Sequence, residues 1–170
     1  FLAVVLLLCA PQVPLTAVAA TPASGTCGDN LTWTLDEEGT LTISGTGAMY
    51  DYLYGGVDSP WCRDYSDSIK KIVIEDGVTT IGEYAFYDCD SLVSITLPAT
   101  LEKIGKGAFE SCDLLASFNM PTSVKEVSEF AFKDCKSIKT LDLSNIEKIQ
   151  KGAFLNCSVL ETITVSDKIE

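Results

Sequence analysis

Residues 92–114 read LVSITLPATLEKIGKGAFESCDL, and a similar motif recurs along the chain every 22 or 23 residues. Alignment on the cysteine of the motif defines four complete units and a partial fifth. Units one to five are residues 69–91, 92–114, 115–137, 138–159 and 160–170. A unit of 22 or 23 residues cannot enclose its own apolar side. We therefore expect neighbouring units to stack as the coils of a solenoid and to share one core.

Each unit carries the same apolar skeleton. In unit one, Ile72 and Ile74 stand two positions apart, which predicts a short strand with one face turned inward. Pro98 and Pro121 end the equivalent strands of units two and three, because proline donates no hydrogen bond to a sheet. We expect these strands to pair in parallel, each with the next, into one sheet.

An Ala-Phe pair and a cysteine follow in every complete unit and predict two internal ladders. The ladders consist of Phe86, Phe109, Phe132 and Phe154, and of Cys89, Cys112, Cys135 and Cys157. Free cysteine behaves as a small buried hydrophobe, and spacings of 23, 23 and 22 do not match the tight cysteine pairs of zinc sites. Parallel side chains one coil apart also exceed the Cβ separation of a disulfide. We interpret the cysteines as buried free thiols, with disulfides and metal ligation as the alternatives.

Residues 21–68 differ from the units and predict an N-terminal cap. NLTWTLDEEGTLTISG alternates apolar and polar residues around a turn, which predicts a two-stranded hairpin. The aromatic residues that follow, from Tyr50 to Trp61, either cover the open end of unit one or form a platform for a carbohydrate. Cys27 and Cys62 lie outside the cysteine ladder, and the sequence leaves open whether they form a disulfide.

Residues 1–20 have the apolar run and small-residue cleavage region of a secretory signal peptide, without a basic beginning. A lipoprotein signal at Cys9 is the alternative, although Leu8 stands where a small residue is expected. The missing basic region and the incomplete unit five lead us to expect that the natural protein extends past both ends of this sequence.

Composition narrows the functions that this chain can perform. The chain has no histidine, so catalysis by a Ser-His-Asp or Cys-His arrangement and metal binding by imidazole are excluded. A net charge of −12 disfavours nucleic acid and anionic membrane as partners. Acidic pairs such as Glu75-Asp76 fall in predicted turns and favour a solvated surface over a carboxylate-based hydrolase.

The unit LxxIxLPxxLxxIGxxAFxxCxx resembles the BspA-type leucine-rich repeat. The leader from SGTCGDNLTWTLDEEGTLTISG to SIKKIVIEDGVTTIG is similar to the cap that opens such arrays. The resemblance implies a β-rich α/β solenoid: a leucine-rich repeat array over 69–170, with a parallel sheet on one face, after a β-hairpin cap over 21–68. It also implies a secreted or surface-exposed bacterial protein, not an enzyme, without catalytic residues or cofactors.

We predict a protein-interaction module, an adhesin that binds proteins or glycans of a host or of neighbouring cells. The alternative is an accessory region of a larger secreted enzyme whose catalytic domain lies past residue 170. Solenoids bind partners on their curved sheet, so the candidate ligand-binding row is the outward residue of each predicted strand. This row consists of Val73, Thr96, Asn119, Asp142 and Thr164, and the alternative is that it is an ordinary solvated sheet face.

Overall fold

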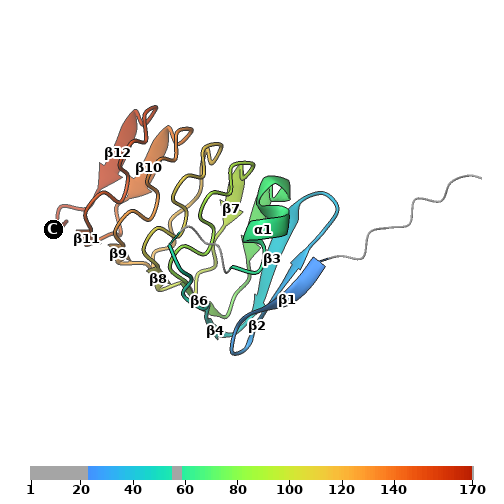
Figure 1. Cartoon of the computed structure of the whole chain (residues 1–170). Helices are drawn as coiled ribbons and strands as arrows, with labels where there is room; N and C mark the ends of the chain where they lie inside the picture. The colour runs from blue at the N-terminus through green and yellow to red at the C-terminus, as the bar shows by residue number, and fades with distance from the viewer. Residues whose placement is uncertain (1–22, 55–58, 170) are drawn as a thin grey trace, which may run out of the picture.

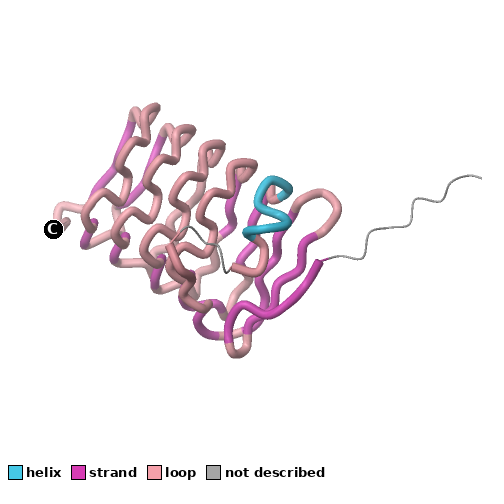
Figure 2. Tube along the Cα trace, viewed as in Figure 1, coloured by secondary structure: helices cyan, strands magenta, loops and turns pink. Residues whose placement is uncertain are grey.

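A computed structural model describes residues 23–54 and 59–169, except for the side chains of Cys62 and Arg63. The chain coils into a solenoid, with the cap at one end and the C-terminus at the other (Figure 1). Strands lie along two sides of the array, and loops join them (Figure 2). The predicted signal peptide, residues 1–20, lies outside the described residues.

The cap contains the predicted hairpin and a further strand that pairs with it. The hairpin is β2 (Leu31–Leu35) and β3 (Thr40–Gly45), which are antiparallel. Strand β1 (Ala23–Gly28) pairs antiparallel with β2 and was not predicted, because its sequence ASGTCG has no apolar alternation. Gly25 allows this pairing, since a Cβ there would lie 2.7 Å from Nε1 of Trp33.

The predicted strands of the units form the first sheet, but the sheet is interrupted. Its order is β1-β2-β3-β5-β7, and a separate pair β10-β12 follows. The strands of the units are β5 (Lys71–Ile74), β7 (Ser94–Thr96), β10 (Thr140–Leu143) and β12 (Thr162–Val165). Strand β3 pairs in parallel with β5, so the cap and the array share this sheet.

The expectation of one unbroken sheet was wrong at unit three. There the segment from Ser117 to Met120 forms no strand and makes only an isolated bridge between Ser117 and Ser94. Phe118 distinguishes this unit, since the other units have an isoleucine or leucine at the equivalent position. Its ring stacks on that of Phe132, with the centroids 4.6 Å apart. The bridge between Ser94 and Ser117 keeps the register of the array, and we attribute the loss of pairing after Ser117 to the larger side chain.

A second sheet, which was not predicted, runs along the opposite side of the coils. Its strands are β4 (Gly47–Ala48), β6 (Val78–Ile81), β8 (Lys103–Ile104), β9 (Glu126–Val127) and β11 (Lys148–Ile149). All its pairings are parallel, and the order β11-β9-β8-β6-β4 is continuous from the cap to unit four. Figure 1 shows these strands along one side of the array and β7, β10 and β12 along the other.

Between the two sheets, the phenylalanine side chains form one stack. Successive ring centroids of Phe86, Phe109, Phe132 and Phe154 are 5.2, 5.3 and 5.5 Å apart. The first three are fully buried, and Phe154 is partly buried. Trp61 closes the stack at the cap end, with its ring 5.2 Å from that of Phe86 and its Nε1 donating to the carbonyl of Ala85 at 2.7 Å.

Helix is confined to the junction of cap and array within the described residues. Helix α1 (Cys62–Tyr65) and the 3-10 helix η1 (Ser66–Ser68) bring the chain from Trp61 to unit one. Elsewhere each coil turns through residues with positive φ. One such position holds Tyr84, Gly107, Phe130 and Gly152, and a second holds Asp88, Ser111, Asp134 and Asn156. The second position has only small polar residues, which tolerate the left-handed region better than other non-glycine side chains.

Candidate binding surfaces

The structure brings the predicted binding row only partly together. Val73 and Thr96 are register partners in β5 and β7, and Asp142 and Thr164 are partners in β10 and β12. Val73 is half-buried and the other members are exposed. Asn119 belongs to the segment that forms no strand, so the row is divided into two pairs at unit three.

A pocket of about 410 Å³ lies at this division, and we call it the interruption pocket. Its lining consists of Ser117, Phe118, Asn119, Met120, Thr122, Thr140, Asp142 and Asn145. Hydrogen bonds from Ser144 lower the pKa of Asp142, whose Oδ1 accepts from the backbone N–H of Ser144 at 3.0 Å. Two residues of the predicted row, Asn119 and Asp142, therefore line one hollow whose other lining side chains are uncharged.

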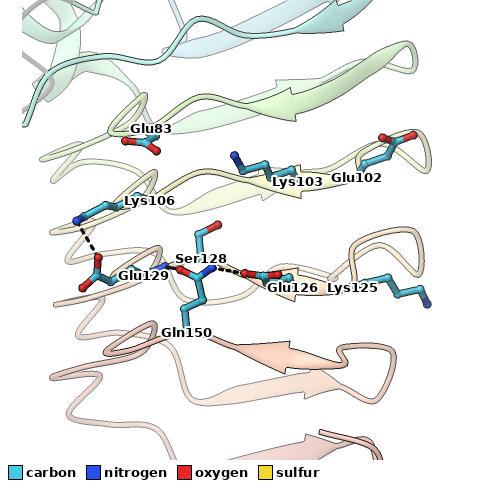
Figure 3. A pocket seen from close by; sticks show the side chains of 9 residues that line it. All are labelled: Glu83, Glu102, Lys103, Lys106, Lys125, Glu126, Ser128, Glu129 and Gln150. Carbon is cyan, nitrogen blue, oxygen red and sulfur yellow. Dashed lines mark hydrogen bonds and ion pairs between the residues drawn. The ribbon is translucent and has the colours of Figure 1, made fainter. Parts of the chain in front are cut away.

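A larger hollow lies over the second sheet, and we call it the charged groove (Figure 3). Its volume is about 550 Å³, and it is lined by Glu83, Glu102, Lys103, Lys106, Lys125, Glu126, Ser128, Glu129 and Gln150. The charges alternate from one coil to the next. The three columns are Glu102-Lys125-Glu147, Lys103-Glu126-Lys148 and Glu83-Lys106-Glu129-Lys151.

Several of these charged side chains form ion pairs with side chains of the neighbouring coil. Nζ of Lys106 lies 2.7 Å from a carboxylate oxygen of Glu129, which raises the pKa of Lys106. Glu126 accepts from the amide of Gln150 and from Lys148 at 3.3 Å, and the hydrogen bond from Gln150 is the main cause that lowers the pKa of Glu126. Opposite charges at equivalent positions thus hold adjacent coils in register.

Other lining groups have no partner within the described residues. No ion pair is formed there by Lys103, Glu83 or Glu102. The hydroxyl of Ser128 makes no hydrogen bond there, and Ser128 as a residue is 7% exposed. The charged groove was not predicted from the sequence, because the second sheet that it covers was not predicted. The signal that could have indicated it is the sign alternation of the charges at the repeat interval.

The cysteine ladder is a structural feature. Sγ of Cys112, Cys135 and Cys157 donates to the carbonyl of the phenylalanine in the preceding unit, at 3.2, 3.2 and 3.3 Å. Burial raises the pKa of the Cys112 thiol well above its ordinary value and that of Cys157 to about 11. A reactive thiol needs a lowered pKa, so these protonated donors favour packing over catalysis. All four members of the ladder are free thiols.

Cys27 is fully buried in β1 and is a free thiol in the structure. Burial raises its pKa to about 11. The side chain of Cys62 lies outside the described side chains, so the pairing of these two cysteines stays a prediction.

Aromatic residues of the cap divide into a buried and an exposed group. Trp33 and Trp61 are buried, with their rings 5.8 Å apart, and they pack against the array as a cap does. Tyr50 and Tyr54 are exposed, and the hydroxyl of Tyr50 donates to Asp29 at 2.8 Å. Trp33 and Trp61 are therefore the aromatic residues of the cap that cover the end of the core.

Within the described residues, no group of three or more histidine, cysteine, aspartate or glutamate side chains is arranged to hold a metal ion. No helix in that part of the chain is long and apolar enough to cross a membrane.

Comparison with known proteins identifies the repeat. The model of the BspA type leucine rich repeat region matches residues 62–170 in six copies, which is more than half of the chain. The chain belongs to this family. A comparison with curated proteins gave no match.

The solved structures that resemble the chain are bacterial leucine-rich repeat proteins. One from Eubacterium ventriosum is 27% identical over 88% of this chain, with a TM-score of 0.72. A leucine rich cell surface protein of Faecalibacterium prausnitzii is 22% identical over 89%, with a TM-score of 0.60, and the pneumococcal vaccine antigen PcpA is 18% identical over 86%, with a TM-score of 0.51. The chain spans 45%, 45% and 50% of their lengths.

Proposed function

We propose that this chain is the protein-binding module of a secreted or surface-displayed bacterial protein and acts in adhesion. The observation that carries the proposal is the stacked array itself, which keeps its apolar side chains inside and presents polar side chains on two outward sheet faces. Each face is hollowed, by the interruption pocket on one side and by the charged groove on the other. Repeat arrays of this kind use such extended faces to bind partners.

Surface display is supported by two lines of argument. Residues 1–20 have the composition of a secretory signal. A resembling solved structure is described as a leucine rich cell surface protein. Fusing residues 1–24 to a reporter enzyme that is active only outside the cytoplasm tests this part directly, and we expect activity that is lost when Leu6 and Leu7 are changed to arginine.

The binding test uses immobilised fibronectin, laminin, collagen and mucin as probes for protein and glycan partners. We expect saturable binding of the chain to at least one of them. In the double variant Asn119→Lys, Asp142→Lys, we expect binding about tenfold weaker, because the two changes place bulk and positive charge in the interruption pocket. The matched control is Asn30→Lys with Asp76→Lys, two exposed positions outside that pocket.

Absence of saturable binding to all four probes would count against an adhesive role. Binding that the double variant leaves unchanged would exclude the predicted row as the contact surface.

A second candidate function is that of an accessory region in a larger enzyme. The observation in its favour is length, since two solved proteins of the same fold are more than twice as long as their aligned part. Sequencing the gene past the codon for Glu170 separates the two. A catalytic domain there would make these repeats a targeting region, whereas further repeats would favour adhesion.

A further inference from the structure

The charged groove opens where the repeat changes a glycine to a larger residue. Gly82 and Gly105 hold one position in units one and two, and Ser128 and Gln150 hold it in units three and four. At Gly105 a Cβ would lie 2.7 Å from the backbone of the preceding coil, so no side chain fits there. Ser128 does carry one, and its side chain points toward unit two, into the hollow beside Lys103 (Figure 3).

Two hydrogen-bond donors therefore meet in the groove without a protein acceptor. Ser128 is 7% exposed as a residue, and its hydroxyl makes no hydrogen bond within the described residues. The ammonium of Lys103 makes no ion pair there. Both groups line the groove, so a ligand that brings one acceptor to both donors gains hydrogen bonds there without displacing a protein partner.

The surroundings restrict the charge of this ligand. Glu102 precedes Lys103 on the same coil and Glu83 lies on the neighbouring coil, on the other side of Lys103 in Figure 3. Neither glutamate forms an ion pair within the described part of the chain. The chain as a whole carries a charge of −12, which disfavours a polyanionic partner. The fitting ligand presents one carboxylate between two cationic groups.

We propose that the charged groove binds an extended peptide segment with the pattern Lys-x-Glu-x-Lys. The central carboxylate accepts from Nζ of Lys103 and from the hydroxyl of Ser128, and the two ammonium groups face Glu83 and Glu102. In an extended chain, side chains two residues apart point the same way, about 6.5–7 Å apart. The proposal rests on the binding function proposed above and identifies a surface other than the predicted row.

The probe is the peptide acetyl-Gly-Lys-Gly-Glu-Gly-Lys-Gly-amide, titrated into the ¹⁵N-labelled chain and followed by amide chemical shifts. We expect saturable shifts at Lys103, Gly105 and Ser128. A peptide with glutamine in place of glutamate should bind about tenfold more weakly. Lys103→Gln should weaken binding of the glutamate peptide to the same extent, and Ser128→Ala should weaken it severalfold.

The matched control is Lys139→Gln, which removes one exposed lysine outside the groove and should leave the affinity unchanged. Thermal unfolding checks that each variant remains folded. Equal affinity for the two peptides, or equal affinity of the Lys103 and Lys139 variants, overturns the proposal. Because the peptide is tested directly, this failure is separate from that of the binding function, which the immobilised probes test on the other face.

Discussion

The two sheets of the array differ in continuity, although both are built by stacking the same repeated coils. On one side the second sheet continues from the cap through unit four, although strands β8, β9 and β11 have only two residues each. The phenylalanine stack between the sheets continues over the same length. On the other side the first sheet has longer strands and is interrupted at unit three. Continuity in a solenoid thus depends less on strand length than on equal side-chain volume at equivalent positions of every coil.

The largest effect is expected from interrupting the phenylalanine stack between the two sheets. Phe109 is fully buried between Phe86 and Phe132, so Phe109→Ala leaves a cavity that neighbouring coils cannot fill, and it should lower the free energy of unfolding by about 3–5 kcal/mol. Urea unfolding followed by circular dichroism measures the loss. The matched control is Phe154→Ala, which removes a partly buried ring and should cost clearly less. Equal losses would show that the stack does not act as one core.

The next effect concerns ion pairs that join unit three to unit two. Nζ of Lys133 lies 2.7 Å from a carboxylate oxygen of Glu110, whose side chain is only 3% exposed, and the hydrogen bond that Lys133 donates to Glu110 raises the pKa of Lys133 to about 12. Lys133→Met leaves that carboxylate buried without its partner and should cost about 2–3 kcal/mol. The control is Lys136→Met, which breaks an exposed pair with Asp113 at the same interval and should cost little. The comparison fails if both variants have the same unfolding midpoint in urea.

The cysteine ladder predicts how the stability of the folded chain depends on pH. Burial raises the pKa of Cys112 well above the ordinary value of 9.0 and that of Cys157 to about 11, so the folded chain keeps protons that the unfolded chain loses. The stabilisation is complete below pH 9 and declines as the pH rises from there toward and past 11. Urea unfolding at pH 8 and at pH 10.5 measures the decline, and Cys112→Ser should reduce it. An equal decline in that variant would assign the effect to other groups.

Much of this architecture follows from the sequence, because the repeat fixes equivalent positions. The coils, the hairpin β2–β3 and the positions of Phe109 and Cys112 in their ladders could be predicted in this way. The second sheet could not be predicted, because strands of two to four residues are too short to show a periodic pattern. The charged groove depends on that sheet and on the change from Gly105 to Ser128, so it becomes visible only when the coils are stacked.

The interruption at unit three could not be predicted from the sequence either, because Phe118 fits the apolar pattern of the repeat. It differs from the isoleucine or leucine of the other units only in its size and shape.

Phe118→Ile is expected to restore the unbroken first sheet, since isoleucine holds this position in units one and two. Hydrogen exchange should show new protection at the amides of residues 118–120 and 141–143, with a change in stability below about 1 kcal/mol, because buried aromatic area is lost while sheet hydrogen bonds are gained. The matched control is Phe118→Leu, an isomer of isoleucine with a lower strand preference, which should restore less protection. Unchanged exchange in Phe118→Ile would transfer the cause of the interruption from the ring to the neighbouring residues Asn119 and Met120. Restored pairing would show that one side chain divides the predicted binding row and opens the interruption pocket.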